Sequence, residues 1–180
     1  MAELWDVYDV SRRKTGRTVV RGEALADGEY HLIADIWIMN SKGEVLLQKR
    51  SMEKELAPGL WCCTGGSAIA GENGRQAFIR EMTEELGVAP DLAHSEIVFS
   101  YTKGSYHKDV WLVRQNIPME AFQLQKEEVE AVRWVPLAEL EVLAKNPAMV
   151  WQLSYLDRII AYLKGKMQPE ELPHAKDLSR

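Results

Sequence analysis

The sequence predicts one compact α/β domain, and three observations support this class. The chain has 180 residues, of which 46% are hydrophobic, and a domain of this size buries roughly 70% of the surface that its unfolded chain exposes. Several short segments rich in β-favouring residues are separated by turn residues, which indicates strands. One central segment has apolar residues at three- and four-residue spacing, which indicates an amphipathic helix.

The N-terminal part of the chain predicts a small β-hairpin. Residues 4–10 and 18–25 are short, apolar and β-favouring, and a polar segment at 11–16 separates them and ends in Gly16. Polar residues followed by glycine are typical of a turn between two strands. We therefore expect a hairpin extension that precedes the main part of the domain.

Two core strands are predicted next. Residues 31–39 and 44–50 flank the sequence Asn-Ser-Lys-Gly at 40–43, and these residue types suit a tight hairpin turn. After a loop, residues 60–64 predict a further short strand that leads into two consecutive glycines at 65–66.

A helix is predicted to begin near Gly74 and to end at Gly87. Glycine commonly ends helices because it adopts the left-handed backbone conformation without a steric penalty. The apolar stripe of this helix consists of Ala77, Phe78, Ile79, Met82 and Leu86.

The second half of the chain predicts strands followed by helices. We expect strands at residues 97–101, 108–114 and 129–135, with a turn at 103–105 between the first two, and helices at 136–144 and 148–163. The second of these helices has a broad apolar face that either packs on the sheet or forms a dimer contact, so both a monomer and a homodimer are compatible with the sequence. Residues 1–167 are then one domain, and 168–180, which contain two prolines, are a loose tail.

Charge, hydrophobicity and cysteine content indicate which partners and which location to expect. The formal net charge of −5 disfavours nucleic-acid binding, because neutralising phosphates requires an excess of Lys and Arg. No segment has the ~18 consecutive apolar residues of a membrane helix. The two cysteines, Cys62 and Cys63, are adjacent, and neighbouring cysteines rarely form a structural disulfide. We expect a soluble cytoplasmic protein.

Three carboxylates of the predicted helix point to a metal site. At ~100° per residue, Glu81, Glu84 and Glu85 lie on one side of the helix. A glutamate run is by itself more often a solvated face, but like charges four residues apart repel each other unless a cation lies between them. Hard oxygen ligands without paired His or Cys favour Mg2+ or Mn2+.

The segment that holds these carboxylates resembles the Nudix box. Residues 66–88 read G-S-A-I-A-G-E-N-G-R-Q-A-F-I-R-E-M-T-E-E-L-G-V. They match the pattern Gly, five residues, Glu, seven residues, Arg-Glu-aliphatic-any-Glu-Glu-any-Gly-aliphatic at every fixed position. At average residue frequencies, a chance match is rarer than about one in a billion.

The resemblance implies a fold and a set of roles. The family fold is an α/β/α sandwich around a mixed sheet. In such a site Glu81, Glu84 and Glu85 bind the metal directly or through water, the Gly65 carbonyl completes the site, and Glu72 and Arg80 form a structural ion pair. Gly66 is the fixed glycine that opens the box.

The resemblance also implies the reaction. A member of this family is a metal-dependent hydrolase that cleaves a diphosphate linkage in a nucleoside diphosphate derivative or another small organic diphosphate. The partner is thus a small phosphorylated metabolite. Water attacks phosphorus and a glutamate accepts its proton. The candidates for this base are Glu84 or Glu85 on the helix and Glu128, beside Glu127, just before the strand that starts at Val129.

A second resemblance concerns one branch of the family. The sequences L-W-D-V-Y-D at 4–9, Y-H-L at 30–32 and P-G-L-W at 58–61 are similar to isopentenyl-diphosphate isomerases. In this branch, basic residues at the positions of Arg50 and Lys54 bind the substrate diphosphate.

The residues that make these relatives isomerases differ here. Gly65 stands where the isomerases have their cysteine, and Ser67 stands where they have a metal-binding histidine. His107 and Asp109 replace two glutamates of a later strand, and His31 alone matches a metal-site histidine. An isomerase and a non-catalytic Nudix-like ligand sensor are therefore the alternatives to a hydrolase, and the roles of His31, His107 and Asp109 stay open.

Overall fold

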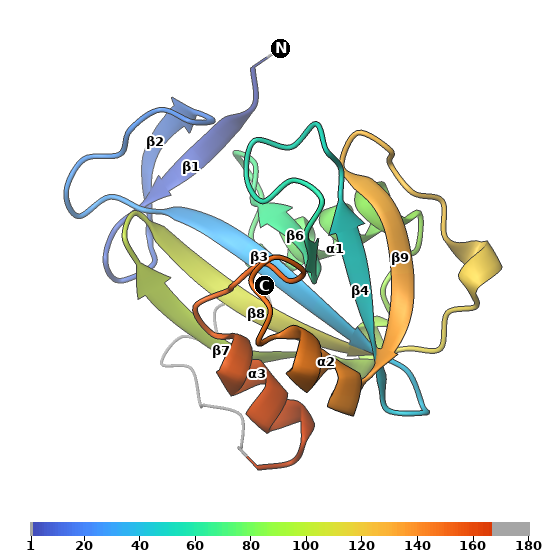
Figure 1. Ribbon diagram of the computed structural model, residues 1–180. Helices are drawn as coiled ribbons and strands as arrows, with labels where there is room; N and C mark the ends of the chain where they lie inside the picture. Colours follow the sequence, from blue (N-terminus) through green and yellow to red (C-terminus); the bar gives the residue numbers. More distant parts are fainter. Residues whose placement is uncertain (1, 167–180) are drawn as a thin grey trace.

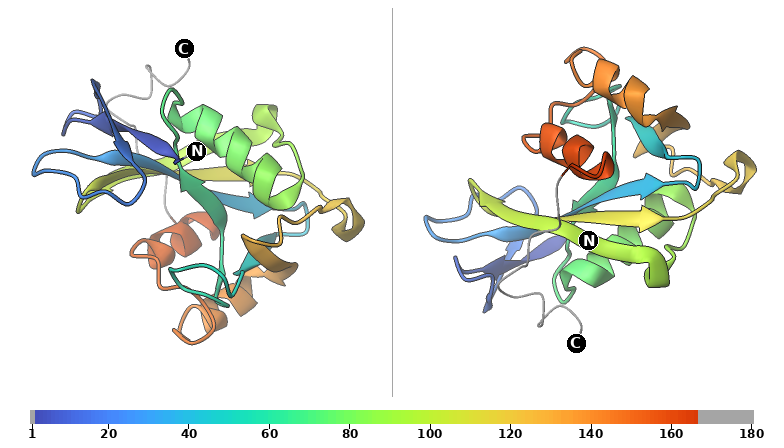
Figure 2. Two further views of the ribbon diagram at one scale, coloured as in Figure 1. Left: turned by 90° about the horizontal axis from the view of Figure 1, so that it is seen from above. Right: turned by 90° about the horizontal axis from the view of Figure 1, so that it is seen from below.

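A mixed β-sheet with helices on both faces makes up the fold (Figure 1). The computed structural model describes residues 2–166. Helix α1 (Gly74–Leu86) covers one face of the sheet, and α2 (Leu137–Leu143) and α3 (Leu156–Leu163) cover the other (Figure 2). The predicted α/β/α sandwich is confirmed.

Nine strands are present among the described residues, two in a separate N-terminal hairpin and seven in the main sheet. The hairpin strands are β1 (Leu4–Tyr8) and β2 (Lys14–Val20). The strands of the main sheet are β3 (His31–Met39), β4 (Glu44–Arg50), β5 (Trp61–Cys62), β6 (Thr64–Ser67), β7 (Ser95–Lys103), β8 (Tyr106–Arg114) and β9 (Val129–Pro136).

The main sheet divides beside its central strand. β3 runs parallel to β8 along its whole length, but it pairs with β4 only at Met39 and Val45. Beyond this point β3 pairs with β6, whereas β4 pairs with β5 and β9. The two halves of the sheet therefore separate toward the end of β4.

Side chains of β3 point alternately to the two faces of the sheet and contribute to a hydrophobic core on each face. Ile36 and Ile38 face α1 and pack with Phe78, whose ring stacks on Trp111 at a centroid distance of 4.6 Å. Trp37 faces the opposite side and packs in the core that α2 and α3 cover. A strand with apolar residues on both faces is expected when helices cover both sides of a sheet.

The N-terminal hairpin forms as predicted, but its turn comes earlier. The turn lies around Arg12, which has a φ of 64°, and Asp9 closes it by accepting from the backbone N–H of Arg13 at 2.9 Å. Residues 14–16 consequently belong to β2 instead of the turn, and the predicted second strand at 18–25 was wrong in its bounds. An Asp side chain that accepts from a nearby backbone N–H favours a turn at that point.

The predicted long helix at 148–163 was wrong in its first half. Val150 forms a parallel bridge with Trp61, and Trp151 donates its backbone N–H to the Trp61 carbonyl at 3.0 Å. This backbone pairing with β5 outweighs the helical pattern, so the helix begins only at Leu156. Its apolar residues Ile159 and Ile160 lie in the core, so the structure shows this face packing within the chain.

Two further sequence predictions concern the C-terminal tail and membrane-spanning helices. The loose tail at 168–180 lies outside the described residues. Between residues 2 and 166, no helix is long and apolar enough to span a membrane.

Candidate active site

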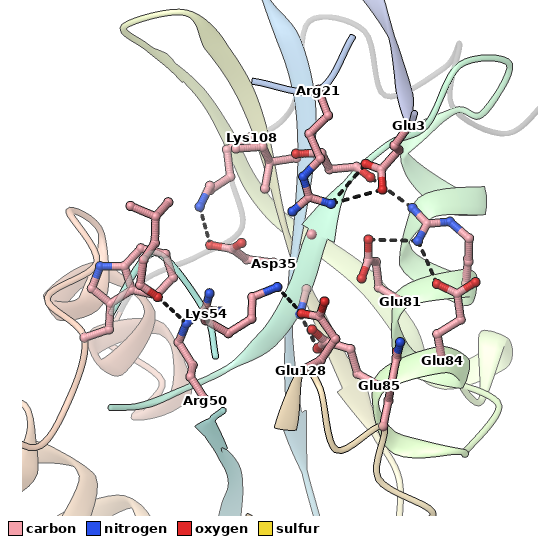
Figure 3. Close-up of a pocket in the computed structure, with 18 residues that line it drawn as sticks. Glu3, Arg21, Asp35, Arg50, Lys54, Glu81, Glu84, Glu85, Lys108 and Glu128 are labelled. Atoms are coloured by element: carbon pink, nitrogen blue, oxygen red, sulfur yellow. Dashed lines mark hydrogen bonds and ion pairs between the residues drawn. The ribbon is translucent and has the colours of Figure 1, made fainter. Parts of the chain in front are cut away.

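A pocket of about 280 Å³ lies where the two halves of the sheet separate (Figure 3). Its walls come from α1, β3, β4, β6 and β8, from the two ends of the N-terminal hairpin, from the loop after β4 and from the segments that precede β9 and α3. The residues that line it are Glu3, Arg21, Ile33, Asp35, Arg50, Lys54, Leu56, Gly65, Gly66, Ser67, Arg80, Glu81, Glu84, Glu85, Lys108, Gln125, Glu128 and Trp151.

The ends of α1 are fixed by its sequence, as predicted. Asn73 accepts from the backbone N–H of Gln76, and the Gln76 side chain accepts from the backbone N–H of Asn73, both at 2.9 Å. This reciprocal capping pair sets the first turn. Gly87 ends the helix with a φ of 70°. With both ends fixed, Glu81 and Glu85 lie one turn apart on the side of the pocket.

Glu81 is a buried carboxylate, with 9% of its surface exposed. Its Oε1 atom lies 2.9 Å from the Arg80 guanidinium. Burial, and then the charge of Glu85, raise the pKa of Glu81 to about 7. Gly66 packs directly against this side chain, because a Cβ atom at position 66 would lie 2.3 Å from Glu81 Oε1.

Glu85 is more deeply buried and is held by three donors. Its Oε2 atom accepts from Gln48 at 2.9 Å, from the Gly65 backbone N–H at 3.2 Å and from the Thr64 hydroxyl. Burial raises the pKa of Glu85, although these hydrogen bonds act in the opposite direction. Gly65 has a φ of 142°, and a Cβ there would meet the Ala34 carbonyl oxygen at 2.2 Å, so only glycine fits this position.

Arg80 connects α1 to the loop before it. Its guanidinium donates to both carboxylate oxygens of Glu72, at 2.8 and 3.1 Å, and to the Ser67 carbonyl at 2.9 Å. Arg80 also donates to Glu84 at 2.9 Å, but the Glu84 side chain is 54% exposed.

The three glutamates of the helix are therefore not equivalent. Among residues 2–166, no group of three or more His, Cys, Asp or Glu side chains is arranged to hold a metal ion. Glu84 also lines the pocket and shares Arg80 with Glu81, but it is the more exposed of the three glutamates, and its predicted part in the metal site stays a prediction. Glu81 and Glu85 still fit a hard divalent cation, since both are buried carboxylates whose pKa values are raised and whose charges a cation would offset.

Basic side chains lie across the pocket from α1 (Figure 3). The buried Arg50 donates from Nε to the Leu56 carbonyl at 2.8 Å, and its guanidinium carbon lies 4.9 Å from the centre of the Trp151 ring. Lys54 forms an ion pair with Glu128. The structure thus brings Arg50, Lys54 and Glu128 to one pocket, and it joins the last two, for which the sequence predicted separate roles.

The three residues whose roles the comparison with isomerases left open lie outside the pocket. His31 stacks on Trp5 with the ring centres 4.1 Å apart, and burial lowers its pKa to about 4. His107 is fully buried, and its Nε2 lies 2.8 Å from the Asp9 carbonyl oxygen. Asp109 pairs with Arg12 of the hairpin. These three residues do not line the pocket.

The cysteines do not face the pocket either. Cys62 and Cys63 are free and buried, and burial raises the pKa of both thiols. Buried thiols with raised pKa values are small packing residues and not reactive groups.

Sequence reasoning missed several residues of the pocket. Asp35 lies within an apolar strand segment, where a charged residue is a signal that could have found it, whereas Lys108 lies between His107 and Asp109 and has no such local signal. Glu3 and Arg21 come from the hairpin, and Trp151 comes from the segment that was predicted as helix. Gln48 reaches the site by its hydrogen bond to Glu85.

The fold and the site define a class of enzyme, and comparison with known proteins identifies the family. The NUDIX domain model matches residues 29–158, and the chain belongs to the Nudix family. It is a Nudix hydrolase. It is 42% identical over 145 residues to an uncharacterised Nudix hydrolase of Listeria monocytogenes, covering 80% of this chain and 86% of that one.

More distant relatives agree with this placement. The chain is 31% identical over 135 residues to the isopentenyl-diphosphate Delta-isomerase of Escherichia coli, covering 72% of this chain and 73% of the isomerase. The resemblance to the isomerase branch is thereby confirmed. A crystal structure from Deinococcus radiodurans has the same fold, with a TM-score of 0.71 and 20% identity, over 89% of this chain and 99% of that one.

Proposed function

We propose that this Nudix hydrolase cleaves a diphosphate linkage in a small phosphorylated metabolite and that it uses Mg2+ or Mn2+ to do so. The observation that carries the proposal is the pair Glu81 and Glu85, two buried carboxylates on one turn of α1 at the wall of the pocket. A protein that buries two like charges so close together must compensate for them. A divalent cation with oxygen ligands is the compensation that this donor set favours.

The other side of the pocket fits an anionic substrate. Arg50 lines the pocket and is held in place by the Leu56 carbonyl and the Trp151 ring, and its planar guanidinium suits bidentate contact with phosphate oxygens. Lys54 supplies a second positive charge. A diphosphate held by these two residues lies between them and the carboxylates of α1.

The roles of the chain's own residues follow from this arrangement. Glu81 and Glu85, together with the Gly65 carbonyl, would hold the cation. When bound, such a cation neutralises phosphate charge and lowers the pKa of water. Glu128 is our preferred proton acceptor, because it lies in the same pocket but outside the buried pair. Lys54, as its ion-pair partner, keeps the Glu128 carboxylate oriented until substrate phosphate competes for the lysine.

The similarity to the isomerases raises a second candidate function, which the site does not favour. Moving a double bond requires an acid and a base on opposite sides of a carbon chain. Gly65 has no side chain to provide one of them, and Cys62 and Cys63 are buried and do not line the pocket. Isopentenyl diphosphate with Mg2+ in deuterated water should therefore give no deuterium on carbon.

The proposed function is tested by screening small organic diphosphates for released phosphate products with and without Mg2+. The proposal expects hydrolysis of at least one compound that stops when EDTA removes the metal. Hydrolysis that is indifferent to EDTA would contradict the metal requirement. Deuterium incorporation that Cys62→Ala or Cys63→Ala abolishes would favour the isomerase instead.

A further inference from the structure

Lys108 is a charged residue on the pocket wall to which the Nudix box assigns no role. It is buried on β8, with 7% of its surface exposed, and it lines the pocket. Its Nζ donates to Asp35 Oδ2 on the neighbouring β3 at 2.6 Å. In Figure 3, Lys108 lies on the side of the pocket away from Glu84 and Glu85.

A chain of hydrogen bonds connects this ion pair to the core. Asp35 Oδ2 also accepts from the Tyr155 hydroxyl at 2.6 Å, and the Tyr155 oxygen accepts from Trp37 Nε1 at 3.3 Å. Tyr155 and Trp37 are both buried. Asp35 is therefore fixed from beneath, and it fixes Lys108 in turn.

The rings around Lys108 restrict it further. Its Nζ lies 5.6 Å from the centre of the Tyr106 ring and 5.7 Å from that of Tyr155. Burial alone lowers the pKa of Lys108, but the charge and hydrogen bond of Asp35 outweigh this effect and raise it. The side chain is thus a charged donor held in one place at the pocket wall. An ammonium group has three N–H donors, and Asp35 uses one of them.

Stability alone does not explain why the Lys108–Asp35 ion pair is buried at this position. A buried ion pair is often no more stabilising than apolar residues of the same volume. Apolar replacement would also suit a hydrocarbon substrate, yet the described lining residues include only three large apolar side chains, Ile33, Leu56 and Trp151. The pocket wall at Lys108 and Asp35 instead offers a donor and an acceptor side by side.

We infer that Lys108 and Asp35 form a specificity subsite for the organic group attached to the diphosphate, and that this group carries hydroxyl oxygens. Lys108 donates to a substrate oxygen and Asp35 accepts from a substrate hydroxyl. Tyr155 acts as a positioning residue through Asp35. The inference rests on the proposed diphosphate site, and it assigns to Lys108 and Asp35 the discrimination between hydroxyl-bearing and hydrocarbon groups on the diphosphate.

Two non-hydrolysable probes separate the subsite from the diphosphate site. Methylenediphosphonate carries no further organic group, whereas α,β-methylene-ADP carries an adenosine, whose ribose hydroxyls lie next to the phosphonate. We expect isothermal titration with Mg2+ to show that wild type binds the second probe at least about tenfold tighter, a gain typical of a few good hydrogen bonds. Lys108→Met should remove most of this gain and leave the affinity for methylenediphosphonate unchanged.

Removal of Lys108 alone leaves Asp35 buried without its cation, which can unfold the protein. The double variant Asp35→Asn, Lys108→Met removes both charges and should show the same selective loss. Tyr155→Phe should show a smaller loss of the same kind. Lys49→Met is the matched control, because Lys49 pairs with Glu130 outside the pocket, and it should leave the affinity for both probes unchanged.

Each outcome bears on one claim. If wild type binds methylenediphosphonate but gains nothing from the adenosine of the second probe, the subsite is overturned and the proposed function stands. If the folded double variant keeps the full gain, or loses affinity for both probes equally, the subsite is also overturned. If wild type does not bind methylenediphosphonate, the proposed diphosphate site fails, and the inference fails with it.

Discussion

Gly66 and Glu81 lie so close together that no side chain fits between them. A Cβ atom at position 66 would lie 2.3 Å from Glu81 Oε1, and its nearest contacts are all atoms of this carboxylate. The opening glycine of the box is therefore explained by contact with a carboxylate fifteen residues later in the same motif. The contact also determines what a substitution there displaces.

We expect Gly66→Ala to leave the fold intact and to reduce turnover about 10- to 100-fold, since a displacement of about 1 Å at a reacting centre has effects of this size. The added methyl meets the far end of a flexible side chain, so Glu81 moves and the backbone does not. Gly74→Ala is the control, because a Cβ there would meet Asp109 Oδ2 at 2.6 Å, outside the pocket. Rate assays and thermal midpoints test this prediction. Equal losses of activity in both variants would contradict it.

The raised pKa of Glu81 predicts a pH-dependent cost in the metal-free protein. The native carboxyl has a pKa of about 7 instead of 4.5. Between these values the native state holds a proton that the unfolded state has released, so stability falls as the pH rises through this window and stays low above it. Glutamine does not ionise, and Glu81→Gln should escape this loss.

The measurement is urea unfolding in EDTA at pH 4 and pH 8. At pH 8, Glu81→Gln should be more stable than wild type by about 1 to 3 kcal/mol, and at pH 4 the difference should be small. A variant that is equally or less stable than wild type at pH 8 would show that Glu81 carries no such cost.

The ion pairs of Arg80 lead us to expect that Arg80→Ala destabilises the protein more than Glu84→Ala. Arg80→Ala removes hydrogen bonds to Glu72 and to the Ser67 carbonyl, and it leaves the partly buried Glu72 without its cation. We expect it to lower the free energy of unfolding by about 1 to 3 kcal/mol. Glu84→Ala should cost less than about 0.5 kcal/mol, because exposed pairs contribute little. Denaturant midpoints without metal compare the two, and equal midpoints would count against a structural role for Arg80.

If Glu128 is the proton acceptor, its substitution should affect turnover and metal affinity differently. We expect Glu128→Gln to lower turnover about 100-fold or more while Mg2+ affinity changes little, as for a proton acceptor that is not a metal ligand. Glu127→Gln is the control, since Glu127 is exposed and does not line the pocket. A loss of metal affinity in proportion to rate would make Glu128 a ligand. If neither turnover nor metal affinity changes, the base is a glutamate of α1.

The sequence was most informative where local chemistry decides the structure. The bounds of β3, β4 and α1 match their predictions, because alternating apolar residues, a tight turn and a glycine end are local signals. The segment at 148–155 was mispredicted because its partner, Trp61, is distant in the chain. Hydrogen bonds from Lys108 and Tyr155 to Asp35 span 73 and 120 residues, so no local pattern reveals them.

Sequence spacing also could not rank the three glutamates of the box. All three fall on one side of a helix, but the spacing does not show that Arg80 reaches Glu84 or that Gln48 and Thr64 hold Glu85. Those contacts come from β4, β6 and the exposed edge of α1. They make Glu81 and Glu85 the buried pair and leave Glu84 at the surface.

The most direct test of the account is a Mg2+ titration of diphosphate hydrolysis by wild type and by Glu85→Gln, on whichever compound the wild type hydrolyses. Glutamine has nearly the same shape, so the thermal midpoint should not fall, but it lacks the anionic charge that a hard cation requires. Glu139→Gln on the exposed side of α2 should behave as wild type. We predict that Glu85→Gln lowers turnover about 1,000-fold or more even at saturating Mg2+. Turnover close to that of wild type in a folded Glu85→Gln variant would contradict the assignment of Glu85 to the metal site.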